Sequence, residues 1–234
     1  MDNWTLQRNI LATYNSLRFG MFWIAASTPI VIVVWGYIFN VGWQNSISAY
    51  YFAPLPDDVT KYSIYPGRVI FVGILFALGS FLYLYKGFSK REDVALNCAG
   101  VFALGVAVCP MYVQAGYIPF SNVLHVAFAV LLFMSMAFTA IFCHEETVRW
   151  ITDPARRARY RAAYHVIGWF MALFPVIGLV LAYFFGAVQR NVFWIEAAGI
   201  WAFAAYWLTK SRELKESEAE IRAVTGTLSQ ALPS

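Results

Sequence analysis

The sequence predicts an all-α protein, an integral membrane bundle of six transmembrane helices. Of its 234 residues, 60% are hydrophobic and only 13% are charged, against roughly 45–50% apolar and about 25% charged in an ordinary soluble domain. One soluble core of this size could not bury so much apolar surface, whereas a bilayer solvates the outer face of a bundle with lipid. The apolar residues also gather in six separate runs, with most basic residues between them.

The six runs define the predicted spans. A transmembrane helix needs about 20 mostly apolar residues, and its backbone must be helical because unpaired strand edges leave polar groups unsatisfied in hydrocarbon. The predicted spans are 21–39, 69–86, 95–113, 122–143, 163–187 and 192–209. An amphipathic interfacial segment over 1–20 precedes the transmembrane domain of 21–209, and a charged cytoplasmic tail over 210–234 follows it. Within the tail, residues 210–224 are expected to form a short solvated helix.

The basic residues divide unequally between the two sides of this topology. Fourteen lie in the N-terminal segment, the second and fourth loops and the C-terminal tail, and three lie on the opposite side, namely Lys61, Arg68 and Arg190. Because cytoplasmic loops carry an excess of lysine and arginine, both termini are expected in the cytoplasm. Residues 1–20 contain no continuous apolar run of the kind found in cleavable signal peptides, so the first span is expected to direct insertion.

Composition also narrows the expected partners and cofactors. The net charge is only +4, so the expected partner is membrane lipid and not nucleic acid. Cys98, Cys109 and Cys143 lie in or beside apolar runs without a CxxC spacing, a pattern that predicts neither a zinc site nor a disulfide framework. A single histidine at outer-leaflet depth cannot supply the three protein ligands of a catalytic zinc ion. No metal and no cofactor is therefore expected.

The longest external loop, from about residue 41 to residue 68, is rich in aromatic residues. Aromatic rings at this level commonly form an interfacial belt, and a loop this long in a compact bundle is often functional. We expect the loop to pack over the outer ends of the helices and close a pocket. Tyr50 and Tyr51 would contact an amphipathic ligand there, through an apolar ring and a polar tip.

Several polar side chains fall at one depth, just inside the external membrane surface. His125 lies about 5 Å into the fourth span and Glu196 about 6 Å into the sixth, at 1.5 Å per helical residue. Ser46 and Ser48 follow the external end of the first span, and Arg68 opens the second. An ionisable group at hydrocarbon depth is costly unless it faces a partner or water. These residues are therefore the best candidates for a functional site.

Three interpretations of these polar residues stay open. They could bind a lipid headgroup or a small ligand, or they could form a hydrolytic or acyl-transfer centre with His125 as base, Ser48 as nucleophile and Glu196 as a further member. They could instead be structural, with Glu196 paired to Arg68 or His125 to fix helix packing. A transporter would usually show polar residues through the midplane and repeated halves, and the sequence has few of the former and none of the latter. The ligand-binding candidates are Ser46, Ser48, Tyr50, Tyr51, Arg68, His125 and Glu196.

The order of several short motifs resembles a known family. The motifs are Ser46-Ile47-Ser48 after the first span, a proline and Arg68 ahead of the second, Asn97-Cys98-Ala99-Gly100 opening the third, His125 early in the fourth, and Trp194, Glu196 and Leu208-Thr209-Lys210 in the sixth. This pattern, over most of the chain, resembles the DRAM/Frag/Sfk-type superfamily of six-span membrane proteins. Its members include damage-regulated autophagy modulators and proteins that act in the lipid remodelling of GPI anchors.

The resemblance implies a lipid-related membrane function. The family commonly has an acidic residue directly after the serine that corresponds to Ser48, where this chain has Ala49. The stretch from Ser46 to Tyr51 is also similar to bacterial membrane proteins, which implies a bacterial-type inner membrane without a GPI anchor to remodel. The expected function is binding or handling of lipid through an outer-leaflet polar pocket. The alternative is intramembrane hydrolysis or acyl transfer on a lipid.

Overall fold

Helices make up the part of the chain that the structure describes. The computed structural model describes residues 3–53, 65–111, 120–185 and 191–226, and these ranges contain no β-strand. The all-α prediction is therefore confirmed. The elements are α1 (Asn3–Ile38), the 3-10 helix η1 (Ser48–Phe52), α2 (Pro66–Leu84), α3 (Lys90–Val108), α4 (Phe120–Phe142), α5 (Glu145–Val148), α6 (Pro154–Phe185), α7 (Asn191–Ser217) and α8 (Ala219–Val224). Parts of the predicted external loop, of two spans and of the tail lie outside the described residues, namely 54–64, 112–113, 186–187 and 227–234.

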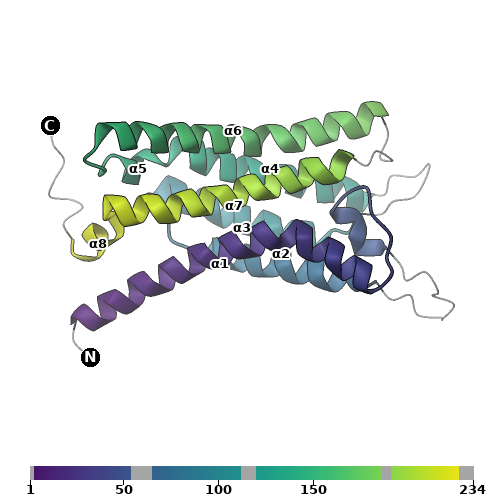
Figure 1. Cartoon of the computed structure of the whole chain (residues 1–234), viewed down its shortest axis with the longest axis horizontal. Helices are drawn as coiled ribbons and strands as arrows, with labels where there is room; N and C mark the ends of the chain where they lie inside the picture. The colour runs from purple at the N-terminus through teal and green to yellow at the C-terminus, as the bar shows by residue number, and fades with distance from the viewer. Residues whose placement is uncertain (1–2, 54–64, 112–119, 186–190, 227–234) are drawn as a thin grey trace.

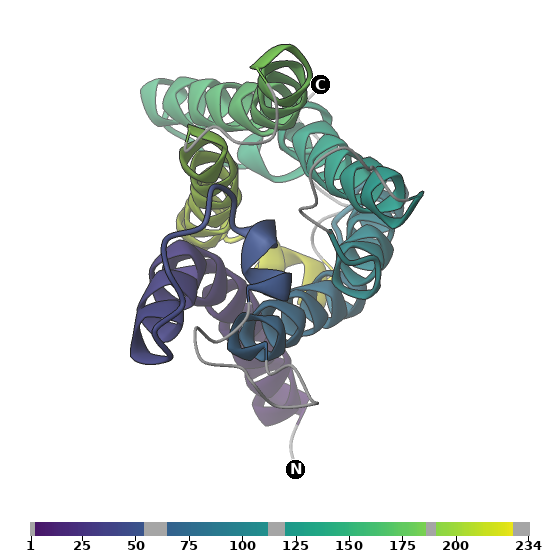
Figure 2. The ribbon, with the colours of Figure 1, turned by 90° about the vertical axis from the view of Figure 1, so that its right-hand side faces the viewer.

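Six long helices form a closed ring. In the order α1, α2, α3, α4, α6 and α7, each helix packs against the next, and α7 packs against α1. Figure 2 looks along this ring, with η1 lying over the near opening, which we call the mouth. The beginning of α1 and the short helix α8 both lie at the opposite end (Figure 1), which we call the terminal end.

Five helices are long and apolar enough to cross a membrane. Their apolar segments are Trp4–Ile38, Pro66–Leu84, Phe120–Val148, Pro154–Val180 and Val192–Ser217. The helix α3, which overlaps the predicted third span, is not one of the five, because it begins with the four charged residues of Lys90–Asp93. The structure thus agrees with a membrane protein, and the count of six spans stays a prediction.

Small residues let α3 pack closely between its two neighbours. A Cβ atom on Gly100 would lie 2.7 Å from the carbonyl oxygen of Gly79 on α2. A Cβ atom on Gly105 would lie 2.6 Å from the ring of Phe128 on α4. Glycine is the residue that lets helix backbones approach this closely. The helix α3 therefore belongs to the wall of the ring, although its first turn is charged.

Exposed apolar side chains cover much of the outer surface of the ring. Soluble monomers seldom expose large contiguous apolar patches, and such patches mark contacts with membranes or other proteins. The side chains that are more than half exposed include Trp23, Ile30, Val69, Phe120, Trp169 and Trp194. Lipid is the solvent that suits this surface.

The two flanking segments differ from their predicted form. The predicted interfacial segment of 1–20 and the first span are one continuous helix, α1, over the described residues. The expectation of a separate, solvated helix is wrong in part for residues 210–217, because α7 continues to Ser217 and Lys210 and Glu213 are buried, whereas Arg212 and Lys215 are exposed. The reason is that the side chains of Lys210 and Glu213 pair with other buried groups inside the ring and not with water.

Candidate functional site

Ser48 and His125 form a buried hydrogen-bonded pair at the mouth. Ser48 begins η1, and His125 lies in the second turn of α4. The Nε2 atom of His125 is 2.9 Å from the Ser48 Oγ, and its Nδ1 atom is 2.7 Å from the carbonyl oxygen of Cys109. Only 9% of Ser48 and 3% of His125 are exposed. Both ring nitrogens therefore have protein partners.

The carbonyl partner fixes the tautomer of this histidine. A carbonyl oxygen can only accept, so the Nδ1 atom of His125 carries the hydrogen and donates it to Cys109. The Nε2 atom of the neutral ring is then an acceptor, and the Ser48 hydroxyl donates to it. A hydroxyl donating to an imidazole that a third group orients is the arrangement of an activated nucleophile and its base.

Glu196 joins this pair from the second turn of α7. Its Oε2 atom accepts the backbone N–H of Ile47 at 2.5 Å, and the N–H of Ser48 also donates to its carboxylate. A second hydrogen bond between α7 and the segment before η1 runs from the N–H of Phe193 to the carbonyl oxygen of Asn45 at 2.8 Å. The start of α7 thus holds the segment that carries Ser48.

The helix η1 is held in the mouth by close packing around Tyr50. The side chain of Tyr50 is 1% exposed, and a Cβ atom on Gly36 of α1 would lie 2.7 Å from its ring. A Cβ atom on Gly67 of α2 would lie 2.3 Å from the Tyr50 carbonyl oxygen. Burial raises the pKa of the Tyr50 hydroxyl, which accepts the N–H of Gln44 at 3.4 Å. Ser46 caps the turn, with its Oγ accepting the N–H of Ala49 at 3.0 Å.

A narrow cavity of about 120 Å³ extends from the polar residues into the ring. Ser48, His125 and Glu196 line its mouth end, and α2 lines it from Phe71 as far as Leu82. Phe71 and Leu82 are about 16 Å apart along the helix at 1.5 Å per residue. The remaining lining is apolar except for Thr28 of α1, whose hydroxyl donates to its own helix. We call this cavity the central cavity.

A second cavity of about 140 Å³ lies mainly between α4, α6 and α7. It is lined by Phe174 and Leu179 of α6, and it shares Ser48, His125 and Glu196 with the central cavity. The three polar residues therefore lie where two apolar cavities meet. This is the arrangement expected of a binding site for an apolar molecule with one polar group.

Arg68 takes a different position from the one that depth alone suggested. Its guanidinium carbon lies over the rings of Tyr51, Phe52 and Tyr65, at 4.8, 4.7 and 4.5 Å from their centres. The ion pairs within the described ranges include none between Arg68 and Glu196. Stacking on aromatic rings stabilises a guanidinium cation. Arg68 thus contacts η1 through the aromatic rings of Tyr51 and Phe52.

The structure brings together only part of the predicted set. Ser48, His125 and Glu196 meet, whereas four predicted ligand-binding residues are not among those that line the two cavities. These four are Ser46, Tyr50, Tyr51 and Arg68. Tyr50 and Tyr51 instead fix η1 to α1 and α2. Their predicted contact with a ligand stays a prediction.

Sequence reasoning missed two features of the molecule. The first is the carbonyl group of Cys109, which no residue type signals because every residue has one. The second is a buried charged cluster at the terminal end, formed by Glu92, Lys210 and Glu213. Its signal is the helical spacing of Lys210, Glu213 and Ser217, which puts polar residues on one face of α7.

Comparisons of the chain with protein-family models, with curated proteins and with solved structures find no match. The functional argument therefore rests on the geometry of the site.

Proposed function

We propose that the chain crosses the membrane six times, with α3 as the third crossing and both termini in the cytoplasm. The position of α3 in the wall of the ring supports the sixth span. An even number of crossings agrees with the position of the beginning of α1 and of α8 at the same end of the ring (Figure 1). The excess of basic residues on that side supports the orientation. The mouth then faces the outside, and the resemblance to bacterial proteins favours an inner membrane.

The function that the site supports best is binding of one lipid acyl chain in the central cavity. The observation that carries it is the polarity of this cavity, which is apolar over its length and polar at the mouth end, at Ser48, His125 and Glu196. Its length of about 16 Å is close to half of the roughly 30 Å hydrocarbon thickness of a bilayer. A chain that followed the whole lining from the outer leaflet would reach the midplane. Because the cavity of about 120 Å³ is smaller than the roughly 300–1,000 Å³ of typical ligand pockets, its apolar side chains would have to move apart to admit the chain.

The polar end of the cavity favours an ester or a hydroxyl over a free carboxylate. Glu196 presents an acidic group there, and its Oε2 atom already accepts a backbone N–H. A fatty-acid carboxylate beside it would lie in a poorly solvated place without a basic partner, because no lysine or arginine is among the described residues that line the two cavities. The Ser48 hydroxyl can still accept a hydrogen bond from a lipid alcohol through its second lone pair, and an ester brings no charge to this end. A neutral lipid ester or alcohol therefore suits this end better.

Photo-crosslinking tests this proposal. Vesicles or micelles would contain a phospholipid with a diazirine at the end of one acyl chain, and labelled peptides would be mapped after irradiation. We expect labels near Leu78, Leu82 and Phe203, which line the deep part of the central cavity. Labels confined to the outer surface, for example around Val69, would contradict it, because Val69 is 71% exposed on the same helix.

A second candidate function is acyl transfer from a lipid ester, and the Ser48–His125 geometry favours it. The Nε2 atom of His125 would take the hydroxyl proton as Ser48 Oγ bonds to the ester carbonyl carbon. The C–O bond to the alcohol would then break, and His125 would return the proton to the departing alcohol. Water or a second alcohol would release the acyl group from Ser48 by the same steps in reverse.

Labelling with a fluorophosphonate probe tests this second candidate. The probe should modify the wild-type chain at Ser48, and Ser48→Ala should abolish the labelling. Ser46→Ala is the matched control, because Ser46 lies two residues away and its Oγ accepts the N–H of Ala49 within its own turn, without lining either cavity. Loss of a general base typically slows such a reaction about 10²- to 10⁴-fold, so His125→Ala should label that much more slowly. A wild-type chain that takes no label would remove the candidate.

A further inference from the structure

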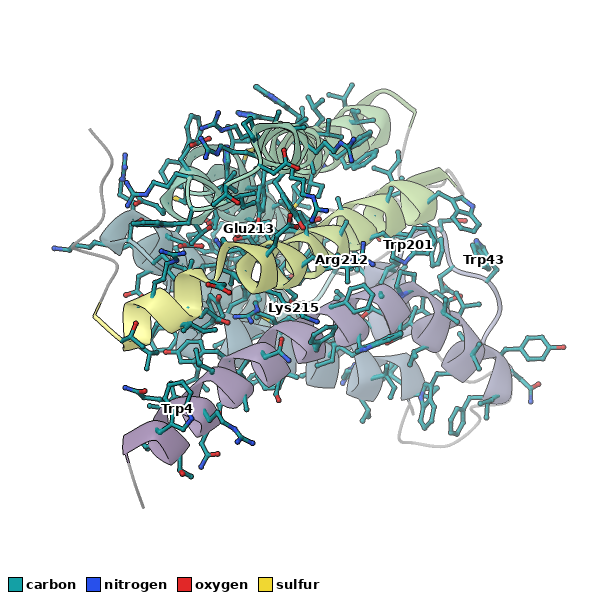
Figure 3. All side chains as sticks on the ribbon, turned by 60° about the vertical axis from the view of Figure 1, so that its left-hand side comes forward. Trp4, Trp43, Trp201, Arg212, Glu213 and Lys215 are labelled. Atoms are coloured by element: carbon teal, nitrogen blue, oxygen red, sulfur yellow. The ribbon has the colours of Figure 1, made fainter. Side chains whose placement is uncertain are left out.

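The terminal end of the ring holds three fully buried ionisable side chains, which we call the terminal cluster. They are Glu92 of α3 and Lys210 and Glu213 of α7, and each is at most 1% exposed. The Lys210 Nζ is 3.4 Å from Glu92 Oε1 and 3.8 Å from Glu213 Oε2. Glu213 thus points into the ring, whereas its neighbours Arg212 and Lys215 are exposed (Figure 3).

Hydrogen bonds connect the cluster to the surrounding helices. Thr147 of α5 accepts from Lys210 at 3.0 Å and donates to Glu213 Oε2 at 2.9 Å. The hydroxyl of Tyr164 on α6 donates to the same oxygen at 3.3 Å. The N–H of Phe88, in the turn before α3, donates to Glu92 Oε2 at 2.7 Å. The cluster therefore joins α3, α5, α6 and α7.

The charges of the cluster do not balance if both carboxyl groups are ionised. Two carboxylates then face a single ammonium group. Among the described residues, the other titratable side chains facing the cluster, which are normally neutral, are Tyr85, Cys143, His144, Tyr160, Tyr164 and Tyr206. Burying an uncompensated charge is unfavourable, and a buried group commonly takes up a proton instead.

The charged neighbours of the cluster do not supply the missing positive charge. Beyond Tyr85, the Arg18 guanidinium is paired with Glu220 through both of its terminal nitrogens. At the rim, Arg91 lies 3.7 Å from Glu146. Arg18 has an acid of its own, and Arg91, which shares Glu146 with Arg149, is 73% exposed, so that solvent screens its charge from the buried carboxyl groups. The excess of one negative charge is therefore local to the terminal cluster.

The hydrogen bonding of the two carboxyl groups indicates where the missing charge lies. Glu213 Oε1 is buried and has no hydrogen-bond partner, although its Oε2 atom has one, whereas Glu92 Oε1 faces the Lys210 Nζ at 3.4 Å. Buried oxygens of native proteins are rarely left in this state. The described residues also contain no group of three or more His, Cys, Asp or Glu side chains able to hold a metal ion. A proton is the cation that Glu213 Oε1 can take.

We propose that Glu213 binds one exchangeable proton, which balances the charge of the terminal cluster while Lys210 pairs with Glu92. With this proton in place, one carboxylate pairs with one ammonium group and the second carboxyl group is neutral. Loss of the proton leaves an extra negative charge among α3, α5, α6 and α7. The stability of the packing at the terminal end therefore depends on the pH of the surrounding solution.

A groove at the terminal end comes within one side chain of the cluster. The groove, with a volume of about 450 Å³, is lined by Tyr85, Lys86, Gly87 and Phe88 together with residues of α1 and α8. The Lys210 Nζ lies 5.3 Å from the centre of the Phe88 ring. Phe88 thus lines the groove and contacts the cluster on its other side. In the proposed orientation the proton exchanges with the cytoplasm.

Glutamate-to-glutamine substitutions test the proposal through the charge balance. Glutamine is neutral and similar in shape, so Glu213→Gln or Glu92→Gln leaves one carboxylate for one lysine without any proton. Reversible unfolding of the full chain in mixed micelles would be followed between pH 5 and pH 9. Glu216→Gln is the matched control, because Glu216 lies on the same helix and pairs with the exposed Arg156 at 2.8 Å.

The expected result follows from proton linkage. An exposed glutamate of the unfolded chain loses its proton near pH 4.3, so the folded wild type would bind one proton more than the unfolded chain above about pH 5. The unfolding equilibrium constant should then rise with pH, by up to tenfold per pH unit, until the folded state releases the proton. The rise should become shallower by the share of one proton in Glu213→Gln or Glu92→Gln, because the carboxyl group of Glu196 at the mouth can still take up a proton, and it should be unchanged in Glu216→Gln. A wild-type profile that does not rise, or one unchanged in both glutamine variants, would overturn the proposal.

Infrared spectroscopy gives a second test that does not depend on stability. The wild type at neutral pH should show the C=O stretch of a protonated carboxyl group. This band should lose intensity in Glu213→Gln or Glu92→Gln. Glu196→Gln is the control, because it removes any contribution of the carboxyl group at the mouth to this band. The contribution of the terminal cluster should remain in that variant. A band that neither cluster variant changes would overturn the proposal even if one variant failed to fold.

Discussion

Replacing Lys210 by methionine should destabilise the protein strongly. The substitution keeps an unbranched apolar chain but removes the ammonium group that faces both Glu92 and Glu213. Breaking a buried ion pair by removing one partner typically costs about 3–5 kcal/mol. That cost corresponds to roughly two to three and a half powers of ten in the unfolding equilibrium constant. Lys210 is 1% exposed, so solvent screening should reduce this cost little.

The assay for this prediction is unfolding in mixed micelles at pH 5 and pH 8, with Lys215→Met as control. Lys215 is exposed on the same helix, and substitutions at such positions usually change stability by less than about 0.5 kcal/mol. In Lys210→Met, two buried carboxyl groups need protons, so its folded state binds more protons than the unfolded chain. Its stability should therefore fall further as the pH rises. Equal stability of Lys210→Met and Lys215→Met at both pH values would refute the reasoning.

Three other predictions concern the mouth and the topology. Gly67→Ala should lower the melting temperature and weaken the Ser48 site, because the added Cβ atom would lie 2.3 Å from the backbone of η1. Gly73→Ala on the same helix should be tolerated, because its Cβ atom would have nothing within 4 Å. Equal melting temperatures of the two variants would contradict this prediction. Glu196→Gln should lower lipid retention more than thermal stability, and the reverse order would make this carboxylate structural. In a chain without its native cysteines, Asn45→Cys should react with an impermeant thiol reagent from outside and Lys215→Cys should not; labelling of both from outside would refute the orientation.

The helices and the depth of the site could be predicted from the sequence, since both depend on local composition. Apolar runs gave helices near the predicted spans, and counting residues from the predicted span ends put His125 and Glu196 at one level. Both residues contact Ser48 or its backbone in the structure. Depth says nothing about which way a side chain faces around its helix. Arg68, at similar depth, therefore stacks on aromatic rings of the preceding loop segment.

The terminal cluster could not be predicted because a charge at the end of a span usually extends into water. Lys210 was assigned to the solvated side on that ground. Its burial depends on α7 continuing to Ser217 and on α5 and α6 supplying Thr147 and Tyr164. Such contacts between distant segments leave no local trace. The orienting carbonyl of Cys109 was hidden for a similar reason, since it depends on backbone position alone.

Native mass spectrometry of protein extracted with minimal detergent tests most directly whether the central cavity binds an acyl chain. The wild-type chain should carry one lipid. Leu78→Trp should lose it, because Leu78 lines the middle of the central cavity and a larger side chain would fill it. Val69→Trp, on the exposed face of the same helix, should keep it. A folded Leu78→Trp variant that retains as much lipid as Val69→Trp, or a wild type without bound lipid, would contradict the account.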